Sequence, residues 1–165
     1  MQETSLYQFN KKSKPEDWNI VDDIVMGGRS SGVIRINNDG YGVFSGNVSL
    51  ENNGGFSSIK YRFNKKTLNK NSKIILKIKG DGKPYQFRLK SKSSDKYSYI
   101  SHFNTGVDWE MIKIDVNSMY PSYRGKQLNL PNDKINSFEE VSIFIGNKRN
   151  ETFILEIDNI KIINE

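Results

Sequence analysis

Hydrophobic and polar residues alternate in short stretches along most of this chain. In residues 58–63, Ile59, Tyr61 and Phe63 fall on one face of an extended backbone, and the residues between them are polar. The same period of two recurs in residues 73–79, except at Ile75, and in residues 85–90, 112–116 and 141–145, and residues 152–163 supply a closing strand. Successive side chains of a β-strand point to opposite faces, so this period predicts strands with one face in the core and the other in solvent.

The segments between these predicted strands carry strong turn signals. They read "NNDG", "ENNGG", "KGDGKP", "NTG" and "YPSYRG". Closely spaced strands without a convincing helical stretch predict an all-β fold, an antiparallel β-sandwich or jelly roll, and 165 residues suit a single domain over residues 1–165. The predicted core residues are Ile59, Tyr61, Phe63, Leu76, Ile78, Phe87, Leu89, Ile112, Ile114, Ile143 and Leu155.

Composition agrees with this fold class and removes several kinds of chemistry. Aromatic residues make up 12% of the chain, and large rings favour strands. The chain has no Cys, which excludes disulfides, thiolate zinc sites and a cysteine nucleophile. The start "MQETSLYQFN" resembles neither a signal peptide nor an organelle targeting segment, and no apolar run approaches the roughly 18 residues of a membrane-spanning helix. We therefore expect a soluble domain without a membrane span, in a compartment that the sequence leaves unknown.

The net charge is +6, from 25 Lys and Arg against 19 Asp and Glu. Such a surface attracts anionic partners, whether nucleic acid, acidic lipid or an acidic protein. The basic residues are scattered, with no run of five or six, which is typical of solvated basic loops. Specific nucleic-acid binding is therefore disfavoured.

Five longer motifs occur together in this chain. They are "WNIVDDIVMGGRSSG", "FSGNVSLENNGGFSSIKYRF", "KGDGKPYQFRLK", "DWEMIKIDVNSMYPSYRGKQL" and "VSIFIGNKRNETFILEIDNIKI". In this order, and over roughly residues 7–162, the sequence closely resembles the complex I intermediate-associated protein 30 family. It departs from the family pattern at Ile24, where a small residue is frequent, and at "GNKRNETF", where a Gly-containing turn is usual.

The resemblance implies a galactose-binding-domain-like jelly roll. It also implies a non-catalytic binding domain, like the family members that help to assemble the mitochondrial NADH:ubiquinone oxidoreductase, with a protein as partner. Many carbohydrate-binding modules share this fold, so a carbohydrate-binding module is the alternative, on fold analogy. An enzyme ranks third, because one His and no Cys supply no constellation of nucleophile, base and orienting group.

The stretch "DDIVMGGRSSG" at residues 22–32 has the residue types of a reaction centre or of a tight corner. Asp22 and Asp23 are adjacent, so on an extended chain they point to opposite faces and cannot converge on one substrate atom. As a structural loop, both carboxylates can accept hydrogen bonds from the following turn, in which Gly27 and Gly28 allow positive φ and close approach. We favour the corner.

Two further residues of this stretch have expected positions. We expect Met26 to enter the core. We expect Arg29 to pair with Asp22, Asp23 or Glu51, or else to face a ligand. If its partner is buried, loss of the guanidinium should cost on the order of 3 kcal/mol.

The candidate binding patch combines basic, amide and aromatic side chains from several turns. In "YPSYRGKQL", Tyr123 and Arg124 are a pair typical of protein interfaces, although Arg124 could equally pair with a loop carboxylate. Asn52 and Asn53 could bind sugar hydroxyls or simply form a corner. The candidate binding residues are Arg29, Asn52, Asn53, Arg88, Tyr99, Tyr123 and Arg124. The rings available to stack on a sugar are Trp18, Phe56, Tyr85, Tyr99, Trp109, Tyr120 and Tyr123, of which most are expected in the core.

Cofactor sites find little support. The sole histidine, His102, has no Cys or second His as a co-ligand, and "KGDGKP" lacks the ending of a phosphate-binding loop. A structural calcium is the one candidate cofactor, because galactose-binding-like domains often carry one. Asp22, Asp23 and Asp158 could supply its oxygen ligands.

Overall fold

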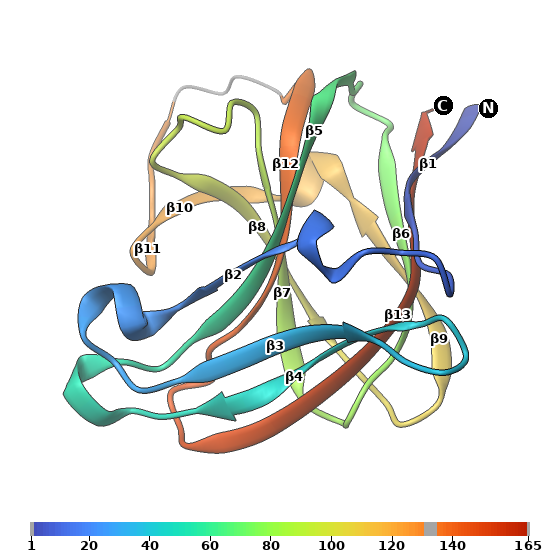
Figure 1. Ribbon diagram of the computed structural model, residues 1–165. Coiled ribbons are helices and arrows are strands. Elements are labelled where there is room, and N and C mark those ends of the chain that lie inside the picture. The colour runs from blue at the N-terminus through green and yellow to red at the C-terminus, as the bar shows by residue number, and fades with distance from the viewer. Residues whose placement is uncertain (1, 131–134, 165) are drawn as a thin grey trace.

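The computed structural model describes residues 2–130 and 135–164, with the backbone alone at Val25 and Met26. Over these residues the chain forms two antiparallel β-sheets packed face to face, with short 3-10 turns in place of α-helices (Figure 1). The prediction of an all-β antiparallel sandwich is confirmed. No helix in the described part of the chain is long and apolar enough to cross a membrane.

The first sheet has six strands within the described residues, and the long strand β13 organises it. The order is β3 (Ser31–Ile36), β4 (Gly42–Val48), β13 (Glu151–Asn164), β6 (Lys73–Lys79) and β9 (Trp109–Asp115). Strand β1 (Gln2–Gln8) pairs with the C-terminal half of β13, from Gln2 opposite Asn164 to Gln8 opposite Asn159. The two ends of the chain therefore lie side by side (Figure 1).

The second sheet has seven strands in the described part of the chain. The order is β11 (Lys126–Gln127), β10 (Tyr120–Tyr123), β8 (Ser98–Asn104), β7 (Pro84–Lys90), β12 (Ser137–Ile145), β5 (Ser57–Thr67) and β2 (Asn19–Asp22). Strand β12 comes late in the sequence but lies between β5 and β7, pairing with both. The 3-10 turns are η1 (Pro15–Asp17), η2 (Asp23–Met26), η3 (Glu51–Asn53) and η4 (Val116–Ser118).

The core lies between the two sheets. Eight of the predicted core residues are at most 3% exposed: Ile59, Leu76, Ile78, Phe87, Leu89, Ile114, Ile143 and Leu155. Tyr61, Phe63 and Ile112 pack against this core but are only partly buried. Tyr61 and Phe63 belong to a row of rings at the core margin, where Tyr61 stacks on Trp18 at 5.3 Å and contacts Phe63 at 5.6 Å.

The outer face of the seven-stranded sheet is hollow. Its polar residues Ser58, Glu140 and Ser142 point away from the core, yet they are only 2%, 2% and 5% exposed. Outward-facing residues of a flat sheet stand in solvent. The low exposure of these three residues therefore means that longer side chains on neighbouring strands surround and cover them. The hollow between those longer side chains is the candidate site.

Candidate binding site

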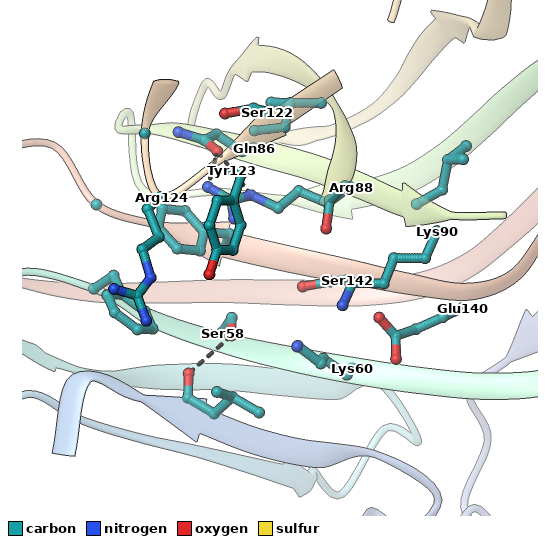
Figure 2. A pocket seen from close by; sticks show the side chains of 18 of the residues that line it. Ser58, Lys60, Gln86, Arg88, Lys90, Ser122, Tyr123, Arg124, Glu140 and Ser142 are labelled. Atoms are coloured by element: carbon teal, nitrogen blue, oxygen red, sulfur yellow. Dashed lines mark hydrogen bonds between the residues drawn. The ribbon is translucent and has the colours of Figure 1, made fainter. Parts of the chain in front are cut away.

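A cleft of about 640 Å³ lies on the outer face of the seven-stranded sheet. We call it the outer cleft. Its lining residues are Val21, Phe56, Ser58, Lys60, Gln86, Arg88, Leu89, Lys90, Lys96, Ser98, Ile100, His102, Tyr120, Ser122, Tyr123, Arg124, Gly125, Glu140, Ser142, Phe144, Gly146 and Lys148. They come mainly from β5, β12, β7, β8 and β10, with loop residues at the rim (Figure 2).

Strand register explains the shape of the outer cleft. Ser142, on β12, lies opposite Lys60 of β5 on one side and Arg88 of β7 on the other. The same cross-strand row continues from Arg88 through Ile100 to Tyr120. Because side chains directly opposite in neighbouring strands stand close together, a serine between two long basic side chains leaves a hollow above its hydroxyl group.

The charge of the outer cleft is strongly positive. Six of its lining residues are cations, namely Lys60, Arg88, Lys90, Lys96, Arg124 and Lys148, against one carboxylate, Glu140. The Glu140 carboxylate already accepts a hydrogen bond from Nε of Arg62, at 2.8 Å. Within the described residues, none of the six cations has a carboxylate oxygen within 4 Å. The cleft therefore carries uncompensated positive charge.

Arg88 lies at the floor of the outer cleft. Its guanidinium group is stacked over the Phe144 ring at 3.7 Å, and its Nε and Nη2 donate hydrogen bonds to Oε1 of Gln86 at 2.9 and 2.7 Å (Figure 2). Burial lowers the pKa of Arg88 to about 10. The group still remains charged at neutral pH, with a neutral amide as its hydrogen-bond acceptor.

Two lysines approach the same region from opposite sides of β12. Figure 2 shows the Lys60 and Lys90 side chains extending toward Ser142 and Glu140. Burial lowers the pKa of Lys60, and the Lys90 and Arg88 charges lower it further, while Glu140 raises it. The Lys90 ammonium group donates a hydrogen bond to the backbone carbonyl of Asp95 at 2.8 Å. The positive charges of Lys60, Lys90 and Arg88 thus lie around the Ser142 hydroxyl group.

The turn after β10 forms the opposite rim. Arg124 has φ of 50° and Gly125 has φ of 81°, which reverses the chain and places the Arg124 guanidinium 5.5 Å from the centre of the Tyr123 ring. Tyr123 is 38% exposed. Below this rim, Nε2 of His102 lies 2.6 Å from the Tyr120 hydroxyl group. The rim therefore combines an accessible aromatic ring with a cation.

Of the predicted binding residues, Arg88, Tyr123 and Arg124 line the outer cleft. Asn53 lines a smaller adjoining hollow of about 250 Å³, which shares Phe144 and other residues with the cleft. Sequence reasoning missed the remaining cations, namely Lys60, Lys90, Lys96 and Lys148. The available signal was the alternation itself, since Lys60 and Lys90 occupy the polar positions of the strands whose apolar positions predicted the core.

Three predicted binding residues lie elsewhere. Tyr99 is on the opposite face of β8, where it packs against the core, because its strand partner Leu89 is a core residue. Asn52, with φ of 56°, is exposed in the η3 turn. Arg29 pairs with Glu51 at 3.3 Å, one of the predicted partners, but both side chains are about two-thirds exposed, at 67% and 68%. The pair is therefore exposed, so the condition under which loss of Arg29 would cost about 3 kcal/mol is not met.

The "DDIVMGGRSSG" stretch forms a corner. Asp23 is fully buried, and its carboxylate accepts hydrogen bonds from the Ser30 amide at 2.8 Å, the Phe56 amide at 3.2 Å, the Ser30 hydroxyl and the Gly55 amide. Burial raises the pKa of Asp23, but these hydrogen bonds outweigh it, so the net pKa is lowered. A Cβ on Gly28 would stand 2.8 Å from Cβ of Asp23, so glycine is required there. The core position predicted for the Met26 side chain lies outside the described residues.

The other corner residues are also engaged in structure. Asp22 accepts hydrogen bonds from the Ser57 hydroxyl and, at 3.1 Å, from the Gly32 amide. Gly27 ends the η2 turn with φ of 85°. Asp22 and Asp23 thus bind different partners, and their carboxylates do not converge on one point.

The calcium candidates do not converge into a recognisable site in the described part of the chain. No group of three or more His, Asp or Glu side chains there is arranged to hold a metal ion. Asp158 instead accepts hydrogen bonds from Nδ2 of Asn159 at 2.6 Å and from Nε2 of Gln8 at 3.5 Å.

The sequence profile described as complex I intermediate-associated protein 30 matches residues 7–157. The chain belongs to this family. "Probable complex I intermediate-associated protein 30, mitochondrial" of Caenorhabditis elegans is 29% identical over 182 residues, covering 96% of this chain and 54% of the relative. The Drosophila melanogaster protein is 21% identical, covering 94% and 61%. The chain thus spans about half the length of these curated relatives.

Solved structures place this member of the complex I intermediate-associated protein 30 family among jelly-roll folds. The family 11 carbohydrate-binding module of a Clostridium thermocellum cellulase has a TM-score of 0.71 and 19% identity, over 99% of this chain and 95% of that one. The same module in complex with a mixed-linked tetrasaccharide gives 0.66. The predicted jelly roll is confirmed, and at this identity the likeness establishes the fold alone.

Proposed function

We propose that this protein is a non-catalytic assembly factor for a respiratory complex of the NADH:ubiquinone oxidoreductase type, and that it binds a protein partner through the outer cleft. The observation that carries the proposal is the cleft itself, with six cations and one carboxylate that is already paired. Family membership supports the assembly role, because the curated relatives are named for association with complex I intermediates.

A binding role also suits the chemistry of the cleft. Its one imidazole, on His102, lies against the Tyr120 hydroxyl group. The serine at its floor, Ser142, lies between Lys60 and Arg88 in the strand register instead of beside a histidine base. A nucleophile with a base and an orienting group would be needed for acyl-transfer chemistry. Charge and an accessible ring are the features of a recognition surface.

Site-directed photo-cross-linking tests this proposal. A benzoylphenylalanine at position 123 places the reactive group on the rim of the outer cleft, and the same residue at position 111 is the control. Met111 is 58% exposed on β9 of the other sheet. We expect position 123 to cross-link subunits of the NADH:ubiquinone oxidoreductase in native extracts, and position 111 to give no such products. Equal labelling from both positions, or products that contain no subunit of that complex, would count against the proposal.

Carbohydrate binding is a second candidate, because Tyr123 offers an accessible ring beside the serine hydroxyls of the cleft. Neutral sugars bind through rings and hydrogen bonds, so their affinity should depend little on ionic strength. Calorimetric titration with a mixed-linked β-glucan oligosaccharide tests this candidate. We expect no saturable heat, and saturable, salt-independent binding that is lost in Tyr123→Ala would place this candidate first.

A further inference from the structure

The floor of the outer cleft has the features of an anion-binding site. Lys60 and Arg88 flank Ser142 on neighbouring strands, and neither has a carboxylate partner within 4 Å among the described residues. Strands are about 4.8 Å apart, so the two side chains start roughly 10 Å from each other, with the serine hydroxyl between them. A carboxylate above Ser142 would lie within reach of both cations.

The electrostatics favour such a ligand. Removing charges from water is costly unless a counter-charge is nearby, and Arg88 and Lys60 are both partly buried with other cations around them. The Glu140 carboxylate accepts a hydrogen bond from Arg62 at 2.8 Å, and its charge also favours the charged form of Lys60, but it does not compensate Arg88. An incoming anion would therefore be stabilised by charges that are already in place, and stacking and hydrogen bonds fix the position of one of them, the Arg88 guanidinium group.

The length of the cleft indicates which kind of molecule could present the anionic group. The lining residues extend from Val21 on β2 to Ser122 on β10, which is five steps across the sheet. At about 4.8 Å a step this is roughly 24 Å, which accommodates about seven residues of an extended polypeptide at about 3.3 Å each. Cations lie along this path, from Lys60 to Arg124. The surface therefore complements an extended chain that bears several carboxylates.

We propose that the outer cleft binds an extended acidic segment of a partner polypeptide, with one Glu or Asp carboxylate held above Ser142 between Lys60 and Arg88. This inference rests on the proposed function for the nature of the partner. It adds the chemistry of the recognised segment and the residues that hold its central carboxylate.

A pair of peptides tests the proposal directly. The probe is a labelled, end-capped seven-residue peptide with Glu at alternate positions and Thr between them, and its control has Gln in place of each Glu. Fluorescence anisotropy with the whole chain should show at least tenfold tighter binding of the Glu peptide at about 0.1 M salt. This preference should shrink at about 1 M salt, where the screening length falls from about 10 Å to about 3 Å. Equal binding of the two peptides would overturn the proposal.

Two sets of variants locate the site. Lys60→Gln should weaken binding of the Glu peptide about tenfold, whereas Lys113→Gln, which removes the same charge from exposed β9, should change it less than twofold. Ser142→Asp supplies a carboxylate from the protein itself. It should melt higher than the isosteric Ser142→Asn and bind the Glu peptide at least tenfold more weakly. Equal effects of the two lysine variants, or a lower melting temperature for Ser142→Asp, would contradict the assignment.

The results separate this inference from the proposed function. If position 123 cross-links subunits of the respiratory complex but the Glu peptide does not bind, the proposal of an acidic segment is wrong and the proposed assembly role stands. If the Glu peptide binds as expected but no such subunit is cross-linked, the cleft chemistry stands and the assembly role fails. Tighter binding of polygalacturonate than of the peptide, at equal charge, would overturn the choice of a polypeptide.

Discussion

Replacement of Asp23 by Asn should destabilise the protein strongly, because this one carboxylate holds the 22–32 corner to the 55–56 backbone. It is fully buried and accepts four hydrogen bonds, from Ser30 through its amide and its hydroxyl and from the Gly55 and Phe56 amides. All of these partners are donors. An Asn side chain retains one acceptor oxygen and turns an NH₂ group toward donors on its other side.

The size of the effect follows from these bonds. A hydrogen bond to a charged group contributes about 1.5–3 kcal/mol, and a buried donor without an acceptor costs about 1–3 kcal/mol. Losing one such bond and weakening the rest should lower the free energy of unfolding of Asp23→Asn by about 4 kcal/mol. In a chain of this size each kcal/mol shifts the melting temperature by about 2–4 °C, so we expect a fall of about 8–16 °C.

The assay is thermal unfolding followed by circular dichroism, with Asp39→Asn as the matched control. Asp39 is exposed in the turn between β3 and β4, so its replacement should change the melting temperature by less than 2 °C. Because the pKa of Asp23 is lowered in the folded state, its contribution is present above the unfolded pKa of about 3.9 and is lost as pH falls through the folded value. The difference in melting temperature between Asp23→Asn and Asp39→Asn should therefore become smaller in acid. An Asp23→Asn melting temperature equal to that of the control at pH 7 would refute this account of the corner.

Three further outcomes are expected. Arg29→Ala should change the free energy of unfolding by at most about 0.5 kcal/mol in chemical denaturation, because its pair with Glu51 is exposed; a loss above 2 kcal/mol would contradict this reasoning. Gly28→Ala should lower the melting temperature by several degrees, since its new methyl group would meet the Asp23 side chain, and an unchanged melt would show that the corner can relax. Tyr85 is buried, which raises its pKa far above the usual value of about 10, so ultraviolet titration of the folded protein should leave it un-ionised at pH 11; ionisation of all tyrosines near pH 10 would contradict its burial.

Strand positions and core residues could be predicted because they depend on local periodicity. The alternation in residues 58–63 correctly placed Ile59 in the core and Lys60 on the opposite face. The corner could be predicted from local turn chemistry. Asp23 and Gly28 are close in sequence, and the glycine leaves room for the Asp23 side chain, whose carboxylate accepts hydrogen bonds from the turn. Four of the five predicted turns, at residues 37–40, 51–55, 79–84 and 104–106, do connect strands. The fifth, at residues 120–125, was wrong in its first four residues, because Tyr120–Tyr123 pair with β8 and form strand β10.

The outer cleft could not be predicted in the same way, because it depends on which strands become neighbours. Ser142 forms the floor between Lys60 and Arg88 only because β12 inserts between β5 and β7, which are separated from it in sequence. Tyr99 resembled a binding residue by type, but the register of β8 against β7 turns it toward Leu89 and the core. Arg29 found a predicted partner, and only the tertiary structure shows that the pair is exposed.

The pairing of β1 with β13 has a practical consequence for protein engineering. Because Gln2 lies opposite Asn164, both ends of the chain leave the six-stranded sheet at one place (Figure 1). The outer cleft lies on the other sheet. The domain can therefore be inserted into a surface loop of a host protein through two short linkers, or circularly permuted by joining its ends, with the outer cleft left unobstructed.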